Sequence, residues 1–393
     1  FHFSCFFFVL ALLSFSLSLS LSLPPFFFFF FSFYINAPRL SPSLKCAAMK
    51  LLKTRHEDVS LAKMKTQLKS LFNAVVAGNN QLVKALLNAN GYPNLFLEDT
   101  EPPIHAAVRS NNLPVVKLLI EAGASSNSVD DSEETVLSLA SRCASPEIVK
   151  LLLQNGADAK AKYVEDGTTA LHFASFGNIQ PLLEAGAEVD VTDEYGQTPL
   201  MAAAFGGRKE EVGLLVQSGA SLQARDTRGY HALDLAARNG HLILSLELFR
   251  RMGSAADEPG PSGSTCLTLI ATRHALRHVK NVCPQKIVLR MVQHLFKIKC
   301  RDFLTRRDPW NMSILDRCFQ NGWIELVRYL IPRGARCVQT DCMSSAKGSA
   351  GLFLRNEVVG ICGVDSWEEA VFKLKQPGQV SFSPPPSLPS IPP

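Results

Sequence analysis

The stretch that decides the fold is DEYGQTPLMAAAFGGRKEEVGLLVQSGA, residues 193–220. Thr198 can cap a helix, and Pro199 suits the first helical position because proline has no N–H to leave unpaired. Three small alanines follow, and Gly207 can end this helix. A second apolar stripe at helical spacing then runs to Gly219, and it consists of Val212, Leu215 and Val216. The stretch therefore predicts two short antiparallel helices and a loop.

The same two-helix pattern recurs along the chain. Residues 71–90 fit it without the Thr-Pro-Leu-His-like entry, which suits a capping unit at the end of a repeat array. The spacing resembles the ankyrin repeat, whose period is about 33 residues and whose signature is Thr-Pro-Leu-His. The other copies span residues 103–124, 135–157, 169–187, 193–220, 226–253 and 308–335.

This resemblance implies an all-α fold. We expect an ankyrin-repeat solenoid of stacked helix–turn–helix units with β-turn or hairpin loops, about seven or eight repeats in all, flanked by disordered termini. The predicted segments are a low-complexity segment (1–48), an N-terminal lead (49–65), a capping ankyrin-like unit (66–95), ankyrin repeats (96–253), a diverged ankyrin unit with a basic insertion (254–307), a C-terminal ankyrin repeat (308–340) and a Gly/Ser-rich then Pro-rich tail (341–393).

One copy is shorter than its neighbours. His172 stands 14 positions before Gly186, whereas His105 stands 18 positions before Gly123. About one helical turn is therefore missing, and we place the loss around residues 177–181. Either this copy forms a kink or weak point in the stack, or the sequence has lost a few codons.

The first 48 residues consist mainly of Phe, Ser, Leu and Pro, which pyrimidine-only codons encode, and they begin with Phe. We interpret them as translated untranslated sequence, with Met49 as the start. A signal peptide or anchor is the alternative, although the segment has no basic n-region, and its apolar runs are shorter than the ~20 residues of a spanning helix. On the first interpretation the protein is soluble and cytoplasmic or nuclear.

His105 and His172 occupy the signature histidine, which in ankyrin folds bonds loop backbone between units. With Thr198 and Pro199 they are predicted to be structural.

Partners of ankyrin folds usually dock on the concave face of the first helices and on the loop tips. Arginine and aromatic side chains are enriched at binding hot spots. We predict a partner-binding face at the positions four past the signature histidine, which hold Arg109, Arg142, Phe176, Phe205 and Arg238. The alternative is that both phenylalanines pack against an adjacent unit.

Charged residues are distributed unevenly. The loop tips of the first units are acidic, and several of their aspartates are expected to shape their own turns. In contrast, residues 273–307 hold many Lys and Arg against Asp302 alone. We predict a basic patch that attracts an acidic partner, or else a plainly solvated helix face, made of Arg273, Arg277, Lys280, Lys286, Arg290, Lys297, Lys299 and Arg301. Nucleic acid is not expected, because interleaved exposed aromatics and recognition motifs are missing.

Catalytic and metal motifs are absent from the sequence. We found no phosphate-binding loop, zinc-protease motif or nucleophile elbow. The 10 cysteines have irregular spacing and no CxxC pair. His274 and His278, near Cys266 and Cys283, leave zinc as an alternative, but no tight motif fixes a fourth ligand. We expect no catalytic residue, no metal and no cofactor.

A formal net charge of +5 is too mild for a general polyanion binder. We therefore expect a monomeric, non-enzymatic scaffold or adaptor that binds other proteins, with neither nucleic acid nor membrane as a partner. One alternative is a substrate-recruiting subunit for ubiquitin ligation, although the helix expected near Trp367 is short for a docking box. Another is a regulatory ankyrin protein that contacts an acidic partner through residues 273–307. The PxxP spacing at Pro386 and Pro389 adds a polyproline II ligand as a further hypothesis.

Overall fold

A computed structural model describes residues 59–89, 91–97, 100–260, 263–272, 283–337 and 349–375. Residues 1–48, the Pro-rich end, Arg273, Arg277, Lys280, His274 and His278 lie outside these described residues. Within them every element is a helix, as predicted, apart from an isolated antiparallel bridge between Val129 and Thr135. The chain divides into two compact units, residues 1–163 and 164–393.

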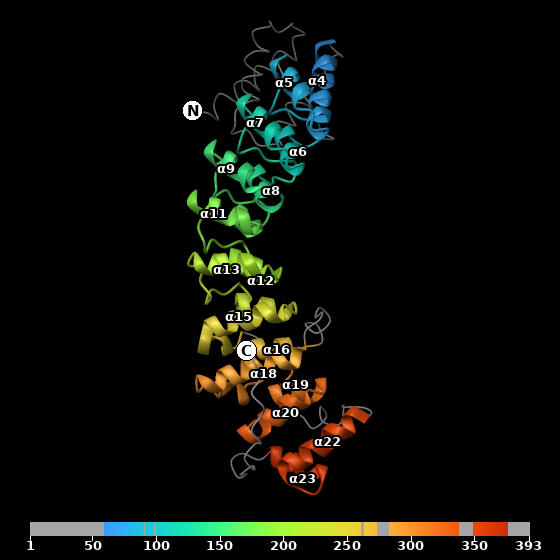
Figure 1. Cartoon of the computed structure of the whole chain (residues 1–393), viewed down its shortest axis with the longest axis vertical. Helices are drawn as coiled ribbons and strands as arrows, with labels where there is room; N and C mark the ends of the chain where they lie inside the picture. The colour runs from blue at the N-terminus through green and yellow to red at the C-terminus, as the bar shows by residue number, and fades with distance from the viewer. Residues whose placement is uncertain are drawn as a thin grey trace, which may run out of the picture. The chain divides into compact units, whose positions relative to one another are not determined.

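Unit 1 is a stack of three helical hairpins (Figure 1). The first helices of the hairpins pack on one another in chain order, and so do the second helices. Apolar residues at helical spacing explain this order, since Val115, Val116 and Leu119 are fully buried. The hairpins are α4 (Val59–Val76) with α5 (Asn80–Asn88), α6 (Pro103–Arg109) with α7 (Leu113–Glu121), and α8 (Val136–Cys143) with α9 (Pro146–Gln154).

Unit 2 continues the hairpin pattern over more elements. Its core runs between the two rows of helices and includes Leu200, Leu215, Phe249 and Phe319, all of which are buried. The elements are α10 (Ala170–Phe173), α11 (Phe176–Glu184), α12 (Pro199–Phe205), α13 (Lys209–Gln217), α14 (Ala232–Arg238), α15 (Leu242–Met252), η1 (Gly253–Asp257), α16 (Cys266–Ile270), α18 (Pro284–Lys297), η2 (Asp302–Leu304), α19 (Ile314–Asn321), α20 (Ile324–Leu330), η3 (Ile331–Arg333), α22 (Ser349–Cys362) and α23 (Trp367–Lys375).

The deciding stretch folds as its residues predict. The Thr198 side chain accepts a hydrogen bond from the Met201 backbone N–H at 3.3 Å, and Pro199 is the first residue of α12. Gly207 follows α12 with φ +68°, and Gly219 follows α13 with φ +92°. Both glycines adopt the left-handed conformation that ends a helix and that other residues enter only with strain.

The missing turn is lost from the first helix of its hairpin, so our placement around residues 177–181 was wrong. Helix α10 has 4 residues, whereas α12 has 7. Helix α11 keeps the same 9 residues as α9 and α13. Ile179 and Leu182 of α11 are buried, so the full-length second helix keeps its apolar face in the core.

One correction concerns the second half of unit 2. Residues 349–375 were assigned to a Gly/Ser-rich then Pro-rich tail with one short helix near Trp367, but they form two helices, α22 and α23, and α22 packs on α20. The short helix expected at Trp367 is α23, and it has a partner helix that the composition did not indicate. In the diverged segment, α16 packs on α14 and α18 packs on α15, which is the order that a further two-helix unit gives. In the described residues no helix is long and apolar enough to cross a membrane.

Candidate functional site

Several of the loops that precede the first helices are each shaped by an aspartate. Asp193 Oδ1 accepts hydrogen bonds from the backbone N–H groups of Tyr195 at 2.9 Å and Gln197 at 2.7 Å. Asp226 does the same for Arg228 and Tyr230 in the next loop. Such bonds fix a tight turn without help from the helices. The backbone at these loop tips is therefore held in a defined conformation.

Both signature histidines bond the backbone of the following loop. His105 Nε2 lies 3.1 Å from the Glu134 carbonyl oxygen, and His172 Nε2 lies 3.0 Å from the Gln197 carbonyl oxygen. Both side chains are buried, and burial lowers the pKa of His105. Buried and bonded to backbone, these imidazoles position loops and are not presented to a ligand.

In unit 1, two of the predicted groove residues occupy equivalent positions. Arg109 ends α6 and Arg142 lies in the last turn of α8, with side chains 55% and 49% exposed. Each guanidinium pairs with a glutamate eight positions earlier: Arg109 Nη2 lies 3.0 Å from Glu101, and Arg142 Nη2 lies 2.9 Å from Glu134. The glutamate partners hold both arginines in place while leaving about half of each side chain open to a partner.

In unit 2, Phe205 and Arg238 occupy the same position in consecutive first helices. Phe205 is the last residue of α12 and is 54% exposed. Arg238 is the last residue of α14 and is exposed, and its guanidinium lies 5.9 Å from the centre of the Tyr230 ring. Helices α12 and α14 pack on each other, so the two side chains belong to one surface.

Phe176 is the exception among the five groove residues. It is 52% exposed, but it is the first residue of α11 rather than the end of a first helix. The shortening of α10 is the cause, because the chain turns at Ala174 and Ser175 before reaching the position where other repeats still have helix. Counting from His172 therefore placed this phenylalanine on the wrong helix.

Sequence reasoning missed two exposed aromatic residues on the loops. Tyr195 is 61% exposed and Trp310 is 60% exposed. Each stands two residues after the aspartate that shapes its loop, and its backbone N–H donates to that aspartate. An aromatic residue two positions after a loop aspartate is therefore a sequence signal that could have located both of them.

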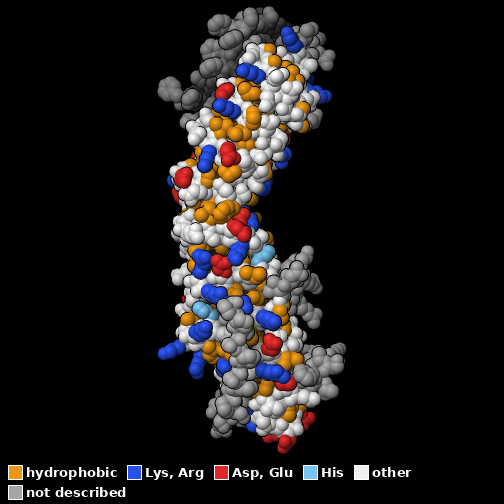
Figure 2. Space-filling view, viewed as in Figure 1, with side chains coloured by type: hydrophobic (Ala, Val, Ile, Leu, Met, Phe, Trp, Pro, Cys, Tyr) orange, Lys and Arg blue, Asp and Glu red, His pale blue; other side chains and the backbone are white. Residues whose placement is uncertain are grey.

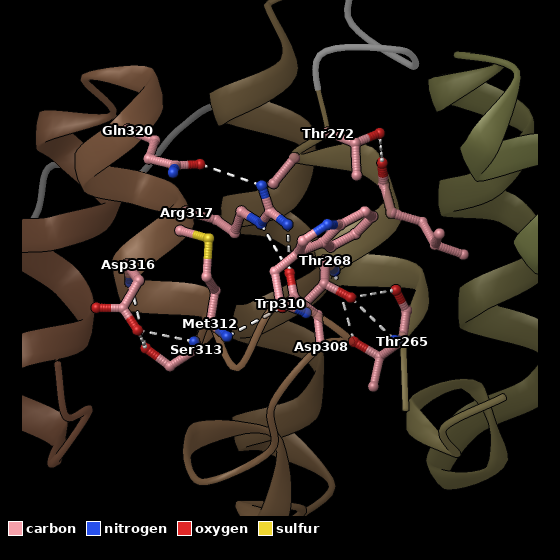
Figure 3. A network of polar contacts seen from close by, with 12 residues as sticks. Thr265, Thr268, Thr272, Asp308, Trp310, Met312, Ser313, Asp316, Arg317 and Gln320 are labelled. Atoms are coloured by element: carbon pink, nitrogen blue, oxygen red, sulfur yellow. Dashed lines mark hydrogen bonds and ion pairs between the residues drawn. The ribbon is translucent and has the colours of Figure 1, made fainter. Parts of the chain in front are cut away.

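A buried ion pair between Arg317 and Asp308 lies against the Trp310 ring (Figure 3). The guanidinium of Arg317 lies 5.0 Å from the centre of the indole ring. That guanidinium donates from Nε to Asp308 Oδ2 at 2.8 Å and from Nη1 to Gln320 Oε1 at 3.1 Å. Asp308 Oδ1 in turn accepts the backbone N–H groups of Trp310 and Met312, both at 3.0 Å. The ring is thus exposed but fixed, as in residues that anchor protein interfaces.

Five residues of the predicted basic patch are described, and all are exposed. They are Lys286, Arg290 and Lys297 on α18, with Lys299 and Arg301 after it. No three His, Cys, Asp or Glu in the described part of the chain come together as a metal ion would require. Cys266 and Cys318 are buried free thiols, and burial raises the pKa of both.

Comparison with known proteins supplies a family for the repeats. A family model described as ankyrin repeats matches three times, at residues 71–163, 104–193 and 171–254. Human "SH3 and multiple ankyrin repeat domains protein 2" is 36% identical over 119 residues, which are 29% of this chain and 6% of that protein. Mouse "Ankyrin repeat domain-containing protein 63" is 38% identical over 98 residues, 24% of this chain and 25% of that protein.

A solved structure is similar as well. The ankyrin repeat domain of Bcl-3 is 31% identical in sequence, with a TM-score of 0.45, and the alignment covers 53% of this chain and 96% of that one. The matches to the two curated relatives span a quarter of their length or less. The likeness to those relatives therefore extends to the repeats and not to the whole proteins.

Proposed function

Since this chain belongs to the ankyrin-repeat protein family, we propose that it is a non-enzymatic adaptor that grips a partner protein through its first-helix ends and loop tips. Ankyrin repeats generally mediate protein–protein interaction and are typically not enzymes. The observation that carries the finer proposal is the exposure of Phe205, at 54%, on a position that three other repeats fill with Arg109, Arg142 and Arg238.

Phe205 offers substantial binding energy to a partner. A phenylalanine side chain can bury roughly 200 Å², so a partner that covers the exposed half removes about 100 Å² from water. At about 25 cal/mol per Å² this contributes about 2.5 kcal/mol before ordering costs. Aromatic anchors of this kind dominate many interfaces, because one well-placed ring is worth several polar contacts.

The surroundings of Phe205 in unit 2 are rigid. The Thr227 backbone N–H donates to the Tyr195 carbonyl oxygen at 2.9 Å, which links the loops before α12 and α14. The Tyr230 ring lies beside the Arg238 guanidinium in the second of these repeats. Two consecutive repeats therefore present aromatic and cationic groups in fixed positions, and a partner loses less ordering entropy when it binds them.

The arginines of unit 1 supply specificity rather than affinity. Arg109 and Arg142 are about half exposed and already paired, and exposed ion pairs contribute roughly 0–1 kcal/mol each. A partner carboxylate would have to compete with Glu101 and Glu134. We therefore expect these arginines to select among partners by charge complementarity.

The proposal is tested by replacing Phe205. The full chain is used as bait in affinity purification from cell lysate, and the main captured protein is then titrated against purified variants by calorimetry. Phe205→Ala should weaken binding roughly 30-fold, which corresponds to about 2 kcal/mol. Phe372→Ala is the matched control, because Phe372 is 60% exposed on α23, away from the first helices. Equal affinity of both variants for the partner, with unchanged circular dichroism, would contradict the proposal.

A second candidate is a substrate-recruiting role in ubiquitin ligation. The observation that favours it is the pair α22 and α23, a folded helical element that follows the last repeat. It is fastened to the array by Arg328 and Glu357, whose side chains form an ion pair at 2.6 Å. Capture experiments on the full chain and on a chain ending at Ser344 distinguish the roles. Loss of cullin-type or elongin-type proteins on truncation supports recruitment, and their absence from the full-chain capture contradicts it.

A further inference from the structure

A hollow lies on the second helices of unit 2, on different elements from the first-helix ends of the proposed interface. Its volume is about 420 Å³, and it is lined by Lys209 of α13, by five residues of α15 and by Arg290 of α18. Figure 2 shows Lys and Arg side chains gathered over these helices. The residues come from three consecutive hairpins, so only the packed array brings them together.

The lining carries an excess of positive charge. Four of its side chains are cationic, namely Lys209, Arg250, Arg251 and Arg290, and one is acidic, Glu247. Glu247 is already engaged, since its carboxylate lies 2.9 Å from Arg251 Nη2 and 3.7 Å from Lys209 Nζ. The other two cationic side chains of the lining, on different helices, have no acidic partner in the hollow.

Arg250 and Arg290 are those two groups. Both are exposed, and neither makes a hydrogen bond or ion pair to another residue in the described ranges. Arginine presents a planar fork that pairs with a carboxylate through two hydrogen bonds. A ligand can therefore pair with the two guanidinium groups without breaking a contact to any residue that the structure describes.

The floor of the hollow is apolar. Ile243 is 54% exposed there, and Leu246 beneath it is 6% exposed. Attraction of an acidic ligand by charge alone does not require an exposed isoleucine among the cationic groups. An aliphatic side chain of a ligand that covers Ile243 would remove apolar surface from water, which stabilises the complex. The volume is in the lower part of the roughly 300–1,000 Å³ range of ligand pockets, which suits one or two side chains.

We propose that this hollow is a docking site for an acidic, amphipathic segment of a partner protein. An aliphatic side chain of the segment lies on Ile243 and Leu246, and flanking carboxylates pair with Arg250 and Arg290. The alternative occupant, nucleic acid, is less well matched, because no aromatic side chain lines the hollow to stack with a base and Glu247 repels phosphate.

Binding of a synthetic peptide to the full chain tests the proposal. The probe is a fluorescein-labelled peptide of about 14 residues with Leu at i and i+4 and Glu or Asp at the other positions, a pattern that forms one apolar and one acidic helix face. Fluorescence polarisation should show binding that weakens as salt rises. A peptide with every acid replaced by Gln or Asn should bind at least roughly tenfold more weakly.

Charge reversal locates the site. The double variant Arg250→Glu/Arg290→Glu should raise the peptide Kd at least roughly tenfold. The matched control is Lys117→Glu/Lys150→Glu, which changes the net charge equally on exposed second-helix positions of unit 1 and should change Kd less than about twofold. Ile243→Ser should weaken binding several-fold, whereas Phe205→Ala should leave it unchanged, so this proposal and the first-helix proposal fail independently.

Three outcomes would overturn the docking site. The first is that the wild-type chain does not bind the acidic peptide, and the second is an equal loss of affinity in both charge-reversal variants. The third is that single-stranded oligouridylate binds more tightly than the peptide and is weakened to the same extent by Arg250→Glu/Arg290→Glu. The last result would assign the hollow to nucleic acid instead.

Discussion

Replacing Gly207 with alanine tests how closely the turn after α12 packs against the next repeat. Gly207 has φ +68°, and a Cβ added there would lie 2.4 Å from His241 Nδ1 and Cε1 and 2.8 Å from Cγ. Holding alanine in this left-handed conformation costs about 1–2 kcal/mol. The imidazole must also move, although His241 Nε2 lies 3.0 Å from the Phe205 carbonyl oxygen. Loss of that hydrogen bond costs about 0.5–1.5 kcal/mol more.

Gly207→Ala should therefore lower the free energy of unfolding by about 1.5–3.5 kcal/mol, the sum of the backbone strain and the lost histidine hydrogen bond. Gly219→Ala is the matched control in the same hairpin. Gly219 has φ +92°, and no atom lies within 4 Å of its added Cβ. Gly219→Ala should therefore lower the free energy of unfolding by the backbone cost alone, about 1–2 kcal/mol.

Urea unfolding followed by far-ultraviolet circular dichroism measures both variants. Because repeat arrays can unfold in stages, the comparison relies on two glycines of one hairpin, which report on the same cooperative segment. In a His241→Ala background the excess cost of Gly207→Ala should disappear, as a double-mutant cycle would show. Equal costs for the two glycine variants, or an excess that persists without the histidine, would refute the reasoning.

Two further predictions concern buried aspartates. Asp308→Asn should destabilise the protein by about 2–3 kcal/mol more than Asp226→Asn in thermal unfolding, because Asp308 pairs with an Arg317 side chain that is 11% exposed, whereas Arg228 beside Asp226 is 54% exposed. Equal losses would mean that the Arg317 pair adds nothing. Burial raises the pKa of Asp257 from 3.8 to about 6, so between these pH values the folded state keeps a proton on this carboxyl that the unfolded state has lost. The stability that this group contributes is therefore fully present below about pH 4 and is lost as pH rises to about 6. The free energy of unfolding of the wild type relative to Asp257→Asn should therefore fall by roughly 2–3 kcal/mol across this window, and a constant difference would contradict the shift.

Repetition explains why most of the fold was predictable. The hairpin of α12 and α13 follows from Thr198, Pro199 and the glycines at +68° and +92°, and each of these signals is local in the chain. Other copies repeat the same signals at a similar spacing, so weak evidence in one unit is supported by its neighbours. The groove positions Phe205 and Arg238 could be counted directly, because their helices have the common length.

Features without a repeated pattern were not predictable. Spacing showed that a turn was missing beside His172 but could not show which helix had lost it, and Phe176 was misplaced as a result. Helices α22 and α23 depend on tertiary packing, with Val358 and Ala370 fully buried, in a segment whose composition suggests a tail. The hollow joins Lys209 to Arg290 through three hairpins, and no local pattern relates residues so far apart in sequence.

The short helix α10 also limits how the length of such a chain can change. An α-helix turns about 100° per residue, so the three residues by which α10 is shorter than α12 correspond to a rotation of about 300°, within about 60° of a full circle. The entry before the loss is preserved, since Thr169 still caps α10 and His172 still reaches the next loop. Removing two residues would instead turn the next segment by about 200° and point its apolar side away from the core. First helices of this array should therefore lengthen or shorten over evolution in whole turns, and a deletion designed into any of them should follow the same step.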